Sequence, residues 1–442
     1  MIEQLMQALN RPGVNDWLLR QVRTQSTQLF LARTEPENRR EALVEEYGVE
    51  VHNDHAAAQD GRPSRGSATV TLLPGEEGRA AERIEQAVFM AGLTDNPPYS
   101  LPGPGIYPEV LISDRRLVVD PGRAARELAD ELRAAVAAEP AVSLASAEFF
   151  IDRRQVALRN SRGIQAEQEG TSLLLDFVLL ARDDEGHETE AHVEVRRRDL
   201  AGLDLLALVR RQAQYARDTL QAAVPASGRL AVLVSDDALH QLLAGEEISP
   251  SPFAFRSSAQ AKYQHLTPWE VGRSVFGDLP ATGDPLTIYA NAILPWGTAS
   301  ARFDGEGLPG QRLPIIENGV LQRFWAGQRY ADYLQIPPTG EFGNLEVMPG
   351  SLPIADLWQD VFYQVVAFSS MMPDPVSGNF VAEIRLGYEK RGNQIRPIKG
   401  GSLSGNLFTD LAAARLSQET VMMGNYLGPQ AVRFPALTIS GG

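Results

Sequence analysis

The chain has 442 residues, 43% hydrophobic and 22% charged, as in ordinary globular proteins. This length allows two or three domains of roughly 150 residues each. The net charge of −15, from 41 Lys and Arg against 56 Asp and Glu, repels phosphate and argues against a nucleic-acid ligand. The absence of cysteine excludes disulfides, thiolate metal ligands and a thiol nucleophile. We find no signal peptide at the start and no apolar run of the ~20 residues that a membrane helix needs, and we expect a cytoplasmic protein that binds no membrane.

Residues 1–225 predict an N-terminal α+β domain in which helices and strands alternate. We expect the end of an opening helix at 15–22, strands at 28–33, 42–52 and 66–73, and a helix over 77–91. A Pro-rich connector at 95–108 marks a subdivision. After it we expect a helix over 121–138, strands at 146–152 and 155–160, a hairpin of 171–181 with 187–196, and a long helix over 203–223.

Residues 226–442 predict a β-rich C-terminal domain, either barrel-like or sandwich-like, because short β-type runs are separated by Gly and Pro. This domain opens with a buried strand at 230–234 and a helix over 238–243. Ser235, Asp236 and Asp237 between them are residue types that cap a helix N-terminus. A strand that leads into a helix bearing a histidine, His240, is a candidate site for metal or catalytic chemistry.

The string from His187 to His192 has the form H-E-x-x-x-H, which is similar to zinc-peptidase signatures. Its neighbours alternate between apolar and polar with period 2, so the segment is predicted to be a half-buried strand. On a strand, residues five apart point to opposite faces and lie about 16 Å apart at ~3.3 Å per residue. Two zinc–nitrogen bonds of about 2.0–2.1 Å to one ion are then impossible. We therefore interpret the string as a solvated strand.

A series of motifs between residues 160 and 407 resembles the TldD/PmbA (TldE) family. Each motif alone is weak, since glycine in a β-rich domain usually marks a turn, but their order and spacing together are specific. The residues that carry the resemblance are Asn160, Ser161, Gly163, Asp304, Glu306, Gly307, Gly319, Gly340, Asn344, Gly378, Gly405 and Asn406.

The resemblance implies a dimer with an N-terminal α/β half and a C-terminal β-rich half. In the TldD type, a helix that follows the first strand of the C-terminal domain carries an H-E-x-x-x-H zinc motif, and a further ligand lies near the C-terminus. The PmbA or TldE type lacks this motif and pairs with TldD. Together the pair resembles a metalloprotease that trims peptides.

The family's zinc helix falls on residues 239–245 of this chain. His240 takes the first ligand position, Gln241 replaces the general base, and Gly245 replaces the second histidine. An amide cannot accept a proton from zinc-bound water, and glycine offers no ligand atom. Ser404, Gly405 and Asn406 fall where TldD members have a metal-binding cysteine. The chain therefore resembles the PmbA/TldE branch that lacks the zinc motif, and we expect no catalytic residue and no metal in it.

For two further clusters we favour a structural interpretation over a functional one. Asp304 and Glu306 could serve acid–base chemistry or bind a cation, but carboxylates beside a glycine more often accept backbone N–H bonds in a tight turn. The basic run 196–198 is most simply a solvated strand end.

We therefore expect a non-catalytic subunit of a TldD/TldE-type metalloprotease complex that processes or degrades peptides. Its partner would be a TldD-like subunit that carries the zinc. Two alternatives stay open. One is a homodimeric peptide-binding or scaffold protein without a peptidase partner, and the other is an independent hydrolase with a non-zinc site.

Overall fold

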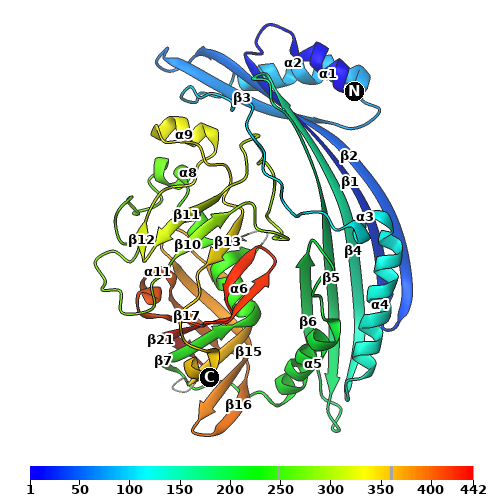
Figure 1. Cartoon of the computed structure of the whole chain (residues 1–442), viewed down its shortest axis with the longest axis vertical. Helices are drawn as coiled ribbons and strands as arrows, with labels where there is room; N and C mark the ends of the chain where they lie inside the picture. Colours follow the sequence, from blue (N-terminus) through cyan, green and yellow to red (C-terminus); the bar gives the residue numbers. More distant parts are fainter. Residues whose placement is uncertain (247–248, 359–361, 442) are drawn as a thin grey trace.

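The computed structural model describes residues 1–246, 249–358 and 362–441. A long, curved sheet lies along one side of a β-rich C-terminal part (Figure 1). The predicted α+β class is confirmed. No helix among the described residues is long and apolar enough to cross a membrane.

The elements of the N-terminal part are α1 (Ile2–Leu9), β1 (Asp16–Ala32), β2 (Glu35–Ala56), β3 (Pro63–Leu72), η1 (Glu77–Arg79), α2 (Ala80–Ala91), α3 (Arg115–Val119), α4 (Pro121–Ala137), β4 (Val142–Asn160), β5 (Gln165–Arg182), β6 (Glu188–Arg197) and α5 (Leu205–Gln221). The strands pair in the order β3-β2-β1-β4-β5-β6, and each described pairing is antiparallel.

The two faces of this sheet bury different partners. Leu19 and Leu29 of β1 lie an even number of residues apart and so point to one face, where Leu19 packs with α1 and α2 and Leu29 with α4 and α5. Leu18 and Val22 point to the other face and pack against Phe303 of the C-terminal part. Residues of β1 are therefore buried on both sides of the sheet.

Two secondary-structure predictions for this part were wrong. Residues 15–22 belong mostly to β1 and not to a helix, because burial on both faces removes the alternation that marks a half-buried strand. Residues 146–160 form one strand, β4, and not two. The segment around Arg153 stays within β4, where the Arg153 side chain forms a cross-strand ion pair with Glu169 of β5 (2.7 Å).

The C-terminal part contains β7 (Gly228–Ser235), α6 (Asp236–Ala244), β8 (Gly245–Glu246), β9 (Ser249–Pro250), α7 (Pro252–Arg256), α8 (Ala259–Tyr263), β10 (Ile288–Asn291), β11 (Arg312–Glu317), β12 (Val320–Leu321), α9 (Gln328–Leu334), β13 (Asn344–Val347), α10 (Ile354–Leu357), β14 (Tyr363–Pro373), β15 (Asn379–Arg391), β16 (Gln394–Ile398), β17 (Ser402–Asn406), α11 (Leu407–Asp410), η2 (Leu411–Ala413), β18 (Arg415–Leu416), β19 (Thr420–Met423), β20 (Tyr426–Pro429) and β21 (Ala431–Ser440).

Two larger sheets of this part enclose one core. One sheet has the order β12-β11-β10-β13-β20-β19. In the other, β14-β7-β21-β17-β15 closes on itself because β14 also pairs with β15, so these strands form a barrel. Val232 and Tyr363 of the barrel share a hydrophobic cluster with Ile288 and Leu345 of the other sheet. The first sheet uses residues 16–197 and these two use 228–440, so we propose 225/226 as the domain boundary.

The two parts of the chain meet around Phe303, which is 2% exposed. Its ring packs among Leu158 and Ile164 of the first sheet and against Tyr107 of the connector (ring centroids 5.4 Å apart). The Tyr107 hydroxyl also donates to the carbonyl of Gly307 (3.1 Å). The connector predicted at 95–108 thus has no helix or strand and joins the two parts.

The interpretation of the basic run 196–198 as a solvated strand end was wrong for Arg198. Its guanidinium donates to the backbone carbonyls of Gly297 (2.8 Å), Thr298 (2.7 Å) and Ser300 (3.0 Å) in the C-terminal part. Burial lowers the pKa of Arg198 to about 10. The last residue of the basic run therefore ties the first sheet to the C-terminal part.

We predict that Phe303→Ala lowers the free energy of unfolding by about 3–5 kcal/mol, because it leaves a cavity in the contact between the two parts. Urea unfolding followed by circular dichroism measures this change. Phe89→Ala is the matched control, because Phe89 is 68% exposed and its loss should change the unfolding free energy little. Equal losses for the two variants would contradict the role given to Phe303.

Candidate functional site

Helix α6 carries the candidate histidine and is held by the barrel. It follows β7, which lies between β14 and β21. Ala238, Leu239 and Leu242 point into the shared core. The expected side-chain cap does not form: the Ser235 hydroxyl donates to Asp236 (3.0 Å) and bonds no backbone N–H at the start of the helix. The apolar face of α6 therefore fixes its position.

His240 lies on the half-buried side of α6, under the hairpin of β19 and β20. Its Nε2 is 3.1 Å from the Oδ1 of Asn425, and its ring meets that of Tyr426 with centroids 6.4 Å apart. Burial lowers the pKa of His240 and outweighs the Asn425 bond and the Glu194 charge, which raise it. In the tautomer with hydrogen on Nε2, the imidazole donates that N–H to the amide oxygen of Asn425.

The other two positions of the predicted zinc helix have different surroundings. Gln241 lies on the helix, beside His240. Gly245 lies beyond the end of α6, which is Ala244, and its backbone has φ 73° and ψ −167°. This conformation is open almost only to glycine. A histidine at 245 would require the helix end to change, so the residues present do not fit a zinc site with three protein ligands.

The residues predicted to replace the C-terminal ligand lie elsewhere in the barrel. Asn406 caps α11 and donates through Nδ2 to the Ser377 carbonyl and to Asn379 (both 2.9 Å). The structure thus brings Asn425, and not Asn406, to His240. Across the described ranges, 1–246, 249–358 and 362–441, no group of three or more His, Asp or Glu side chains could hold a metal ion.

The H-E-x-x-x-H string lies on strand β6 from Glu188 onward, as predicted, but its first residue, His187, precedes the strand. His187 precedes β6 and its Nδ1 bonds Asp183 (2.8 Å), whereas His192 lies on β6 and its Nε2 bonds Asp176 (2.8 Å). Each histidine therefore has its own carboxylate partner.

A small cavity beside α6 lies where the two parts of the chain face each other. Its walls include His192 of β6, Tyr215 of α5 and Arg385 of β15. Asp236 and Asp237 at the start of α6 also line it. Burial, helped by the charge of Asp236, raises the pKa of Asp237 to about 6. The cavity thus joins the strand edge of β6 to the helix that carries His240.

Asp304 and Glu306 form a tight turn, as the structural interpretation predicts. One carboxylate oxygen of Asp304 accepts the backbone N–H groups of Glu306, Gly307 and Leu308 (2.9 Å each). Glu306 accepts the N–H of Gln328 at the start of α9 (2.7 Å). Burial, with the charge of Glu341, raises the pKa of Asp304 to about 6. Burial also raises the pKa of Glu306, to about 7.

Comparison with known proteins relates the C-terminal part of the chain to one family. Residues 227–441 match the family model of the PmbA/TldA metallopeptidase C-terminal domain. The C-terminal part belongs to the TldD/PmbA (TldE) family. The fold of the whole chain agrees, since TldE from Thermococcus kodakarensis superposes with a TM-score of 0.80 over 99% of this chain and 100% of that one, at 19% identity.

Curated relatives match over shorter segments. An uncharacterised protein of Methanocaldococcus jannaschii is 24% identical over 217 residues, which cover 46% of this chain and 49% of the relative. A zinc metalloprotease TldD homologue of Saccharolobus solfataricus is 28% identical over 129 residues, 26% of this chain and 29% of that protein. The chain thus matches about half or less of the length of these relatives.

The residues that suggested the TldD/PmbA family hold turns and joints in the described structure. Asn160 accepts the N–H of Arg162 and of Ile164 and donates to the Pro102 carbonyl (2.8 Å) in the connector. Gly307 has φ 96°, and a Cβ there would lie 2.7 Å from Ile164. Asn344 is fully buried and donates to the Asn291 carbonyl (2.6 Å). These contacts explain the residue types at Asn160, Gly307 and Asn344 without a catalytic role for them.

Sequence reasoning missed Asn425 and the role of Asp237. Asn425 is 185 positions from His240, and only the pairing of β20 with β13 places its hairpin over α6. Asp237 was predicted to be a capping residue. The clue to its burial lay in its position between a buried strand and a helix with an apolar face.

We predict that Glu306→Gln makes the protein more stable at pH 8 than the wild type. Because the native pKa of Glu306 is raised to about 7, the folded state binds more protons than the unfolded state below that pH. Stability therefore falls as pH rises from the ordinary glutamate range through pH 7. The neutral amide should recover on the order of 1 kcal/mol at pH 8 and much less at pH 5.

Urea unfolding at the two pH values measures this difference. Glu37→Gln is the control, because Glu37 is an exposed residue of β2 and its substitution should give the same small shift at both pH values. A Glu306→Gln effect that does not depend on pH would contradict the buried-acid interpretation.

Proposed function

We propose that this chain is the non-catalytic subunit of a TldD/TldE-type metallopeptidase complex that processes or degrades peptides. The observation that carries the proposal is the state of α6. The Nε2 of His240 is bonded to an amide, and the position of the second histidine lies past the helix end in a glycine conformation. The family relationship is to metallopeptidases, so we propose that the zinc chemistry belongs to a TldD-like partner.

In this role the chain would complete a shared chamber and hold the peptide. Strand β6 is an edge strand of the first sheet, and its residues Glu190 to His192 line the cavity beside α6. An extended peptide can pair with such an edge through its main chain, which tolerates many sequences. Acidic residues at α6 would favour basic or neutral peptide segments over acidic ones.

We predict that co-expression with a TldD-like protein yields a stoichiometric complex and that the isolated chain carries no tightly bound zinc. Affinity purification followed by elemental analysis measures both. Stoichiometric zinc in the isolated chain would contradict the proposal. Recovery of a homodimer alone, in the presence of the TldD-like protein, would favour the alternative of a scaffold without a peptidase partner.

His240→Ala in the complex gives the second readout. If His240 takes no part in chemistry, kcat/KM for peptide cleavage should be unchanged. Loss of even a supporting residue around a zinc site typically costs about 10–100-fold, so a fall of that size would overturn the non-catalytic role. Gln241→Ala is the matched control on the same helix, since it should leave kcat/KM unchanged as well.

A further inference from the structure

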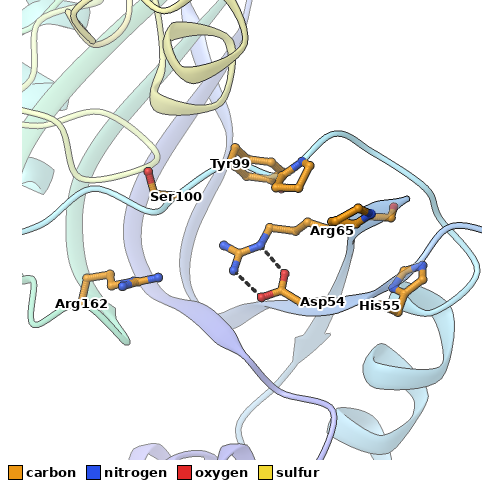
Figure 2. Close-up of a pocket in the computed structure, with 9 residues that line it drawn as sticks. Asp54, His55, Arg65, Tyr99, Ser100 and Arg162 are labelled. Carbon is orange, nitrogen blue, oxygen red and sulfur yellow. Dashed lines mark hydrogen bonds and ion pairs between the residues drawn. The ribbon is translucent and has the colours of Figure 1, made fainter. Parts of the chain in front are cut away.

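A cavity of about 410 Å³ opens at one end of the first sheet and has no part in the site beside α6. Its walls come from the end of β2, the start of β3, the connector and the turn between β4 and β5. This volume lies in the range of small-molecule sites. Figure 2 shows its polar side chains, and the lining residues are Asp54, His55, Pro63, Ser64, Arg65, Pro98, Tyr99, Ser100 and Arg162.

The buried side chain of Arg65 lines this cavity and is held in place by two carboxylates. Its guanidinium grips both carboxylate oxygens of Asp54 (2.6 and 2.8 Å), and its Nη1 lies 3.0 Å from Asp16. The Arg65 side chain is 7% exposed, whereas that of Asp54 is 43% exposed. An ionised carboxylate has about four acceptor positions. Because Arg65 uses two of them, Asp54 can still accept bonds from a ligand.

Arg162 supplies a positive charge from another wall of the cavity, opposite in sign to Asp54. Figure 2 shows it pointing toward the Arg65–Asp54 pair. Its Nη2 donates to Asp16 (2.8 Å), and its side chain is 49% exposed. A guanidinium has five N–H donors in a planar fork that matches a carboxylate. Asp16 also accepts from Ser161 (2.6 Å), so it is held in place and in turn orients Arg162.

The charges of this cluster decide what class of ligand fits. Arg65 and Arg162 are balanced by Asp16 and Asp54, and Asp95 is held by His55 of the lining (3.0 Å), so an added phosphate or divalent cation would leave an excess of one sign. A zwitterion keeps the balance, with its carboxylate at Arg162 and its ammonium group at Asp54. The ring of Tyr99 and the nearby prolines offer an apolar surface for the rest of such a molecule.

We propose that this cavity binds a zwitterionic ligand of amino-acid or dipeptide size, with its carboxylate on Arg162 and its ammonium group on Asp54. The site lies within the first sheet and its connector. It is therefore independent of the role proposed for α6 and can be tested on the full-length chain without a partner.

Isothermal titration calorimetry with alanylalanine tests the proposal. We expect saturable binding to the wild-type chain. N-acetylation of the dipeptide removes the ammonium charge and amidation of its C-terminus removes the carboxylate, and each blocked peptide should bind about tenfold more weakly or not at all. These comparisons use wild-type protein only, so they do not depend on the folding of any variant.

Arg162→Gln tests the assigned residue. It should raise the dissociation constant for alanylalanine by about tenfold or more, because a charge-assisted pair is lost. Arg123→Gln is the matched control, since Arg123 is an arginine of α4 with a 70% exposed side chain and does not line the cavity. Circular dichroism shows whether both variants fold.

Each outcome supports or overturns the proposal. Absence of alanylalanine binding at millimolar concentration would overturn it, as would equal binding of the blocked and free dipeptides. Binding of inorganic phosphate in preference to the dipeptide would show an anion site instead of a zwitterion site. Weaker binding in Arg162→Gln with no change in Arg123→Gln supports the assignment.

Discussion

The contact between Phe303 and the first sheet is the constraint on which the arrangement of this protein depends. It buries one face of β1 and β4, whose opposite face already carries helices. The loop that bears Phe303 is rigid because Asp304 accepts three backbone N–H groups and Glu306 holds the start of α9. The cavity beside α6 lies between the parts that this contact holds together.

The apolar face of α6, and not its polar face, fixes this helix in the barrel. The barrel still presents a strand, a helix and a histidine, since the apolar face of α6 is needed for the core whatever its polar face does. The polar face has different constraints. There His240 is satisfied by Asn425, and the helix ends one residue before Gly245.

Buried arginines recur at the joints of the fold. Arg198 is buried against backbone carbonyls, and Arg65 is buried between Asp16 and Asp54. A buried guanidinium is tolerable when it is hydrogen-bonded or ion-paired, because an unpaired buried charge costs several kcal/mol. The Nη1 of Arg65 has no hydrogen-bond partner but lies 3.0 Å from the Asp16 carboxylate. The arginines at these joints differ in which N–H donors are available to a ligand. Arg198 donates its hydrogen bonds to carbonyls inside the fold. The partly exposed Arg162 has N–H donors beside a cavity. This difference distinguishes a joint of the fold from a candidate binding site.

The sequence by itself determined the α+β class, the resemblance of the C-terminal part to its family, and the strand nature of the segment around His192. These follow from residue type and local periodicity. The predictions for residues 15–22 and for Arg198 were wrong. A strand that is buried on both faces, and a side chain that is buried by a distant part of the chain, leave no local pattern in the sequence. Only the tertiary structure brought Asn425 to His240 and Arg162 to Asp54 across many positions in the chain. Contacts of that kind depend on sheet pairing and domain packing, which the order of residues along one segment does not encode.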